Sequence, residues 1–150
     1  MINISGANNI ILVDSDALIG LIHETDAMHE RCMKIIKFIA QENFAIIVPY
    51  AIVLEAATTF SRGYKIKKPD LALKALNYYL ATEDIPYNDH VAENVAKLYD
   101  PKTSNKNTPF DHYVLALAKK NKISCVFSFD SFYKKHGLIL IEDLIKQKTQ

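Results

Sequence analysis

Short apolar runs along the chain alternate with longer stretches in which apolar residues recur at helical spacing. Continuous apolar runs at Ile10–Val13 and at residues 45–48, 123–127 and 138–141 predict strands that are buried on both faces of a parallel sheet. Residues 83–87 include the dipeptide Ile-Pro and fit only a brief edge strand, because proline has no N–H to donate to a neighbouring strand. The pattern therefore predicts five strands, with the third at an edge.

The segments between the predicted strands carry the apolar periodicity and the capping residues of helices. Thr108 is a typical N-cap residue, Pro109 suits a first helical turn, and Asp111 places a carboxylate near a helix N-terminus, so a helix begins there. Strands that alternate with helices predict right-handed parallel crossovers and an α/β sandwich. The other expected helices cover residues 17–22, 28–40, 49–60, 69–80, 89–99 and 131–135.

The composition is that of an ordinary globular protein, and we expect residues 1–150 to form one domain. The 150 residues are 49% hydrophobic and 23% charged. No apolar run reaches the roughly 20 residues that span a bilayer, and the polar residues 1–9 lack the features of a signal peptide. Cys32 and Cys125 form no CxxC pair, so we interpret them as reduced, packed thiols in a cytoplasmic protein. The formal net charge of +1 neither indicates nor excludes a nucleic acid partner.

Four carboxylates, Asp14, Glu55, Asp111 and Asp130, lie at or just beyond apolar segments, where an open parallel sheet places its ligand crevice. Each has a simpler interpretation taken singly: the aspartates suit helix caps or turns, and Glu55 suits a polar stripe on a helix. If the four converge, their mutual repulsion raises their pKa values or separates them unless a cation binds. Oxygen ligands suit Mg²⁺ or Mn²⁺, and the histidine and cysteine pattern of a zinc site is absent from this set.

The segments around these acids resemble the PIN domain, and within it the VapC-type toxin ribonucleases. The stretch ILVDSDALIGL resembles the opening strand of the family, with Asp14 as its first metal-binding residue. Glu55 occupies the acidic position in VPYAIVLEAATTFSR, Asp111 in TPFDHYVLALAKK, and Asp130 in VFSFDSFYKKHGL, where Ser128 matches a hydroxyl position. The resemblance covers nearly the whole chain, and four acids in the family's order are far more specific than any one of them.

The resemblance implies a three-layer α/β/α sandwich whose central parallel sheet has the strand order 3-2-1-4-5. It implies that Asp14, Glu55, Asp111 and Asp130 bind Mg²⁺ or Mn²⁺ and hydrolyse RNA phosphodiester bonds. It also implies a homodimer that an antitoxin protein holds in check. The sequence departs from the family at Asp16, where an asparagine or small polar residue is frequent. Asp16 is either an outer carboxylate of the site or the N-cap of the following helix.

Two groups of basic residues are candidates for contact with RNA phosphates. Arg62, Lys65, Lys67 and Lys68 cluster around Tyr64, while Lys134 and Lys135 follow Asp130. Solvated lysines on an exposed face are the commoner explanation of such groups. The choice of RNA over DNA comes from the family resemblance and not from these residues.

Three alternatives to a toxin ribonuclease remain open at this stage. The first is a PIN-fold nuclease that processes RNA outside any toxin system. The second is a haloacid-dehalogenase-type phosphatase with Asp14 as nucleophile and Asp16 as acid/base, although Leu18 stands where that class carries a threonine. The third is a non-catalytic binding module, which the presence of all four acids disfavours.

Overall fold

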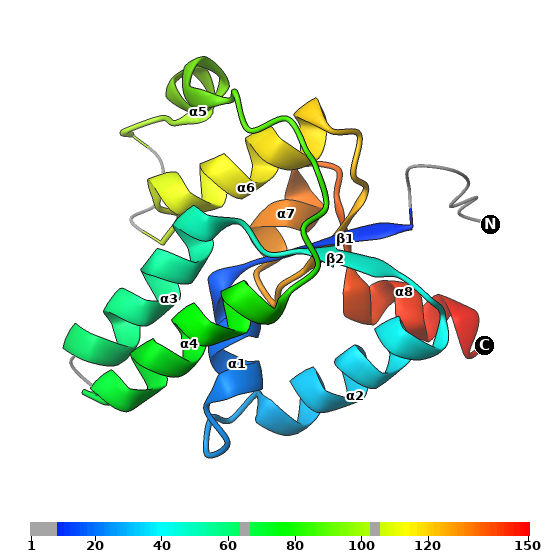
Figure 1. Cartoon of the computed structure of the whole chain (residues 1–150). Helices are drawn as coiled ribbons and strands as arrows, with labels where there is room; N and C mark the ends of the chain where they lie inside the picture. Colours follow the sequence, from blue (N-terminus) through cyan, green and yellow to red (C-terminus); the bar gives the residue numbers. More distant parts are fainter. Residues whose placement is uncertain (1–8, 64–66, 103–105) are drawn as a thin grey trace.

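The computed structural model describes residues 9–63, 67–102 and 106–150 of the chain. Within these ranges four strands and eight helices follow one another along the chain (Figure 1). The strands are β1 (Ile10–Val13), β2 (Ala45–Ile47), β3 (Cys125–Phe127) and β4 (Ile139–Leu140). The helices are α1 (Ser15–Ile22), α2 (His29–Gln41), α3 (Tyr50–Arg62), α4 (Pro69–Ala81), α5 (Ala92–Leu98), α6 (Pro109–Lys120), α7 (Ser131–Lys135) and α8 (Ile141–Lys148).

The strands form one parallel sheet in the order β2-β1-β3-β4. Leu12 of β1 is paired with Ile47 of β2 on one side and with Val126 of β3 on the other. The chain passes from β1 to β2 on one side and later returns to β3 on the opposite side, so the topological switch point lies between β1 and β3. Ligands of open parallel sheets bind beyond the carboxyl ends of the strands at such a point.

The expected third strand, at residues 83–87, is not formed, and the sheet has four strands in place of five. The other four strands keep the predicted order. Residues 83–90 are an extended connection from α4 to α5, and a groove of about 270 Å³ lies between this connection and the end of β2, lined by Ile47, Val48 and Ile85 among others. Pro86 has no N–H to donate, and the groove, which polar and apolar side chains line together, replaces the close backbone approach that a strand pair requires.

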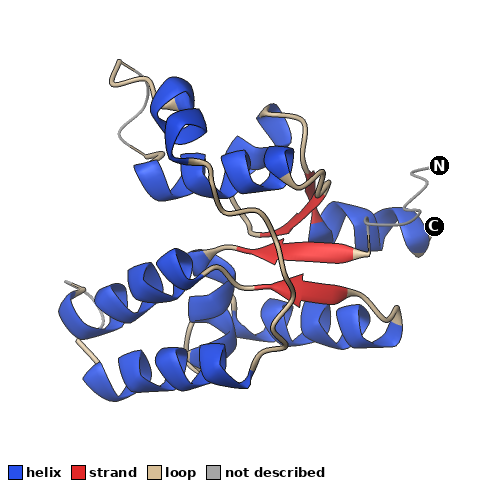
Figure 2. Cartoon of the chain, turned by 45° about the horizontal axis from the view of Figure 1, so that its top comes forward, coloured by secondary structure: helices blue, strands red, loops and turns tan. Residues whose placement is uncertain are grey.

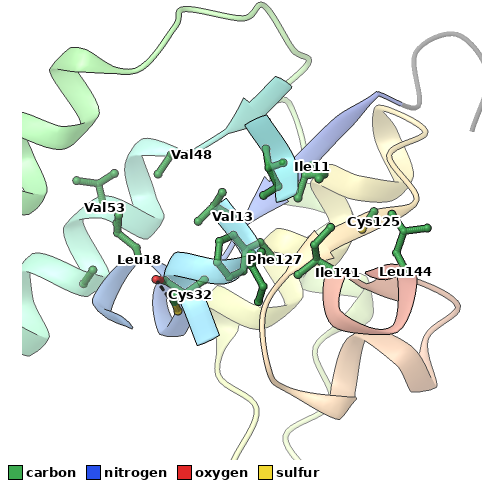
Figure 3. Close-up of a cluster of buried hydrophobic side chains, with 14 residues drawn as sticks. Ile11, Val13, Leu18, Cys32, Val48, Val53, Cys125, Phe127, Ile141 and Leu144 are labelled. Atoms are coloured by element: carbon green, nitrogen blue, oxygen red, sulfur yellow. Dashed lines mark hydrogen bonds between the residues drawn. The ribbon is translucent and has the colours of Figure 1, made fainter. Parts of the chain in front are cut away.

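Helices cover both faces of the sheet, which confirms the predicted three-layer sandwich (Figure 2). The alternation of side chains along β1 explains why both faces need cover. Ile11 and Val13 join a core with α1, α2 and α8, which Figure 3 shows in close-up. Leu12 points the other way and joins Val114 and Leu117 of α6 in a second core. Every strand residue of β1 after Ile10 is therefore buried.

Two sequence-based expectations about the core and the surface can be compared with the structure. Cys32 and Cys125 are both free and buried, as expected of packed thiols. Among the described residues, no helix has the length and apolar character to cross a membrane.

Helix α8 was not predicted from the sequence. It follows β4 directly and packs Ile141 and Leu144 into the core.

A glycine in α1 sets the spacing between α1 and α2. A Cβ atom at Gly20 would lie 2.5 Å from the Sγ atom of Cys32, which is too close for a carbon and a sulfur atom. We predict that Gly20→Ala lowers the free energy of unfolding by about 1–3 kcal/mol, the usual cost of overpacking a core. In a Cys32→Ala background this clash is absent, and alanine's higher helix propensity should then stabilise the protein by about 0.5–1 kcal/mol. Chemical denaturation of wild type, both single variants and the double variant measures the coupling, and a Gly20→Ala penalty of equal size in both backgrounds contradicts the prediction.

Candidate active site

Asp14 lies at the carboxyl end of β1 and is the most deeply buried of the four acids. Its backbone N–H donates to the carbonyl oxygen of Phe127 at 3.1 Å, which continues the pairing of β1 with β3 by one residue. Its side chain then accepts the N–H of Ser15 at 2.7 Å as the N-cap of α1. Only 3% of the residue is exposed. The strand end and the helix start together hold this carboxylate at the switch point.

A buried tyrosine joins Asp14 to Asp111. The hydroxyl of Tyr133 on α7 donates to Oδ2 of Asp14 at 2.6 Å, and it lies 3.4 Å from Oδ1 of Asp111. Tyr133 is fully buried, so its hydroxyl has been withdrawn from bulk water. The two carboxylates come from β1 and α6, which are far apart in sequence, and this hydroxyl fixes their relative position.

Asp111 and Asp130 approach each other from the N-terminal ends of α6 and α7. Asp111 accepts the backbone N–H of Thr108 at 2.8 Å, which confirms the predicted capping arrangement of α6. Asp130 caps α7 by accepting the N–H of Phe132 at 2.9 Å. The side-chain amide of Asn107 lies 3.2 Å from Oδ2 of Asp130 and 3.5 Å from Oδ2 of Asp111. One amide group therefore contacts both carboxylates.

Asp16 ties the first turn of α1 to the segment after β3. One oxygen accepts the N–H of Phe129 at 2.8 Å and the hydroxyl of Ser128 at 3.0 Å. The other accepts the N–H of Ala17 at 2.8 Å. The hydroxyl of Ser128 also lies 3.5 Å from Asp14. Of the two interpretations left open by the sequence, these contacts favour a supporting carboxylate over a simple helix cap, because Asp14 caps α1.

Glu55 reaches toward the same acids from the middle of α3. Its Oε2 atom is buried and has no hydrogen-bond partner among the described residues. The pKa of Glu55 is raised from 4.5 to about 7, chiefly by burial; a hydrogen bond from Ser15 opposes this shift, and the charges of Asp111 and Asp16 contribute to it. A buried carboxylate oxygen without a donor is costly, so this atom indicates a missing positive partner.

The electrostatics of the whole group follow from burial and mutual repulsion. Burial raises the pKa of Asp14 well above its ordinary value, and the charge of Asp16 adds to the effect. Burial likewise raises the pKa values of Asp16 and Asp111, and Asp130 contributes to both shifts. Within the described part of the chain, none of these acids forms an ion pair with a lysine or arginine. The group is thus a concentration of negative charge that the described lysines and arginines do not neutralise by ion pairs.

The donor set fits a hard divalent cation in its chemistry. Every candidate ligand is a carboxylate oxygen, as Mg²⁺ and Mn²⁺ prefer. The orphaned oxygen of Glu55 and the raised pKa values of Asp14 and Asp111 are the expected marks of a cation site in its metal-free form. In the described residues, however, no three His, Cys, Asp or Glu side chains already stand close enough to enclose an ion.

The basic candidates that the structure describes lie on exposed surface. Arg62, Lys67 and Lys68 are exposed at the C-terminal end of α3 and just before α4, whereas Lys65 lies outside the described residues. Lys134 and Lys135 are exposed on α7, and the Nζ atom of Lys134 lies 3.3 Å from Asp143. These positions neither join the acids nor exclude contact with a long substrate.

Two side chains that contact the acids were not predicted from the sequence. Tyr133 was read only as part of a short helix, and Asn107 as part of a polar loop. Each lies close in sequence to a predicted acid, with Tyr133 three residues after Asp130 and Asn107 four residues before Asp111. That proximity was the available signal. Nothing in the local pattern indicated that Tyr133 is buried or that it reaches Asp14 on another element.

The fold and the acidic site together define a class of protein. Residues 11–137 match the family model of the PIN domain, and the chain belongs to that family. Among solved structures, the crystal structure of VapC20 from Mycobacterium tuberculosis, a Sarcin-Ricin loop cleaving toxin, is similar in fold, with a TM-score of 0.71 and 17% sequence identity. The match covers 86% of this chain and 96% of VapC20. No curated protein sequence matches the chain.

The raised pKa of Glu55 gives a prediction about stability in the absence of metal. Its pKa is about 7 in the folded protein against 4.5 ordinarily, so the folded state holds the proton more tightly than the unfolded chain does. The free energy of unfolding therefore falls as the pH rises between these two values and stays low above the higher one. We predict that Glu55→Gln reduces this fall and, at about pH 8 in a chelator, stabilises the protein by on the order of 1 kcal/mol, since partial exposure screens the charge.

Denaturant unfolding at several pH values, with wild type and Glu55→Gln side by side, measures this effect. Glu30→Gln on the exposed face of α2 is the matched control, because it removes a carboxylate outside the acidic group. The prediction is wrong if Glu55→Gln and Glu30→Gln change the pH dependence of unfolding equally.

Proposed function

We propose that this protein is a metal-dependent endoribonuclease and the toxin of a VapBC-type toxin–antitoxin pair. The observation that carries the proposal is the group of carboxylates around the buried Asp14 on a PIN fold, in which Glu55 has an oxygen without a partner among the described residues. Such a group is unfavourable for an apoprotein and suits a protein that binds a divalent cation. Likeness to VapC20, a toxin that cleaves the Sarcin-Ricin loop, supports RNA as the substrate.

The ligands we assign to Mg²⁺ or Mn²⁺ are Asp14, Glu55, Asp111 and Asp130. A bound ion of this kind orients water, lowers its pKa and offsets the charge that develops on a scissile phosphate. The chain's own contribution is to hold the carboxylates in position. Tyr133 orients Asp14 and Asp111, Asn107 orients Asp111 and Asp130, and backbone N–H groups at the starts of α6 and α7 donate to Asp111 and Asp130.

Supporting roles fall to residues around the acids. Asp16 and Ser128 fix the segment after β3 against α1, so we assign them to maintaining the geometry of Asp14. We assign Arg62, Lys65, Lys67, Lys68, Lys134 and Lys135 to the RNA backbone, because lysines and arginines provide the attraction to phosphates that the carboxylates do not.

The assignment to a toxin system carries further expectations about partners. A VapC-type toxin is expected to form a homodimer and to bind an antitoxin that inhibits it, and a cytoplasmic location follows from an RNA substrate.

A PIN-fold nuclease that processes RNA outside a toxin system is the second candidate, since the same acids serve both roles. The family match removes the basis for the phosphatase alternative, and the intact acids disfavour a purely structural module. Toxicity on expression, relieved by a small protein encoded next to the gene, separates the two nucleases.

Replacing single carboxylates tests the active site. We predict that Asp14→Asn and Asp130→Asn each reduce RNA cleavage by at least about 100-fold, because each removes an assigned ligand, while the fold is retained. An asparagine at position 14 still offers an oxygen to Ser15 and an amide to Tyr133. Cleavage of a single-stranded RNA panel with Mn²⁺ and thermal melts measure the two effects. Asp84→Asn, in the exposed connection before α5, is the control and should cleave as wild type does; substantial activity in the Asp14 variant overturns the assignment.

Metal binding should be visible in stability before any substrate is added. Because the acids repel one another in the metal-free protein, a divalent ion binds the folded state preferentially and raises the melting temperature with concentration. We predict that Mn²⁺ does so at least as well as Mg²⁺, and that Asp14→Asn reduces the increase. The measurement is a melt series with each ion and with chelator. A melting temperature that no ion changes, together with cleavage in excess chelator, would exclude the metal-dependent mechanism.

A further inference from the structure

An apolar groove of about 450 Å³ lies between the N-terminal part of α3 and helices α5 and α6. Three of its residues, Pro109, Phe110 and Tyr113, belong to α6, and two of these are aromatic. Phe110 is 37% exposed, which is high for so large an apolar side chain. The groove is also lined by Ala51, Val91 and Val95.

The lining of this groove is close in sequence to two of the acids. Phe110 directly precedes Asp111 on α6, and Ala51 precedes Glu55 by four residues on α3. Residues four apart in a helix share a face and lie about one turn, or about 5–6 Å, from each other. Helices α3 and α6 contact each other. The same pair of helices therefore carries both the groove and two of the carboxylates.

The lining of the groove suits a flat, partly polar group better than a phosphate. Among the described residues, its lining has no lysine or arginine and Asp89 as the only charged side chain, so a phosphate would meet a carboxylate and no cation there. Aromatic faces bind nucleobases by stacking, with little dependence on their identity. A carboxylate such as that of Asp89 can accept a hydrogen bond from the amino group of cytosine N4 or a similar donor. The volume lies in the range of sites for small ligands.

We propose that this groove binds one unpaired base of the RNA next to the scissile phosphate, with Phe110 as the stacking residue and Asp89 as the acceptor that reads the edge of the base. The inference rests on the ribonuclease function proposed above. It makes the groove part of the substrate site, and it requires single-stranded RNA, because a base held in a duplex cannot turn into a pocket.

Removal of the base or of the aromatic ring should have the same consequence. The substrate is a short single-stranded RNA that wild type cleaves at one position, with each flanking nucleotide replaced in turn by an abasic unit. We expect one abasic position to raise KM by on the order of 5- to 100-fold in wild type. Phe110→Ala should raise KM for the intact RNA by the same factor, and the abasic unit should then add nothing. Phe110→Tyr, which keeps the ring, should behave as wild type.

A second variant tests recognition of the edge of the base, and its result does not depend on the ring of Phe110. Asp89→Asn should change the ratio of kcat/KM between RNAs with cytosine and with uracil at the identified position, because an amide can donate where a carboxylate only accepts. Leu73→Ala, at an apolar residue of α4 that is 59% exposed, is the control for loss of exposed apolar surface and should leave KM unchanged.

Three outcomes overturn the inference. If no abasic position distinguishes wild type from Phe110→Ala, no base occupies the groove. If Phe110→Ala changes the sedimentation of the protein and leaves base preference intact, the groove is a protein–protein contact. If wild type cleaves no RNA in a broad panel with Mn²⁺, the ribonuclease function fails and the inference fails with it, whereas cleavage without base dependence refutes the groove alone.

Discussion

The burial of Asp14 at the switch point between β1 and β3 is the constraint on which the site depends. A carboxylate that is only 3% exposed loses most of its hydration, and the other acids of the site repel it as well. The protein offsets part of this cost with neutral donors: the N–H of Ser15 and the hydroxyl of Tyr133. These donors come from α1 and α7, so the folding of both helices against the sheet is a condition for the position of this one side chain.

The sandwich architecture explains how acids so far apart in sequence come together. Parallel strands place their carboxyl ends at one edge, and each is followed by a helix whose N-terminal N–H groups favour a negative charge. Asp14 and Asp130 both use this position, as the caps of α1 and α7. Asp111 uses the N-terminus of α6, which packs on one face of the sheet, and Glu55 enters from the side of α3. The acidic group is therefore a consequence of topology, and only Glu55 lacks a backbone donor of this kind.

The strands next to the switch point could be predicted because their signals are local, whereas the role of the four acids rests on resemblance to the PIN domain and stays a prediction. Continuous apolar runs give β1 and β3, and the Thr-Pro-Phe-Asp sequence gives the start of α6. The edge strand at residues 83–87 failed because pairing with β2 depends on close approach of the two backbones, which no local pattern specifies. Helix α8 was missed because its first residue, Ile141, also completes an apolar run typical of a strand. Tyr133 was missed because its role depends on a contact across 119 positions of the chain.

The groups that donate to Asp14 are neutral, and this leaves its charge available to a cation. A lysine or arginine in contact with Asp14 would neutralise the carboxylate, lower its pKa and compete with a divalent ion for the same oxygens. A tyrosine hydroxyl and a serine N–H orient the oxygens and leave the negative charge in place. Tyr133 donates to Asp14 through a single hydrogen, so the remaining lone pairs of that carboxylate stay available to a metal ion. The described basic side chains that are assigned to RNA are exposed at the end of α3 and on α7. In the proposed function, this separation of inner negative charge from outer positive charge lets one site attract both a cation and a polyanion, because the ion changes the sign of the interaction at the point where the phosphate must lie.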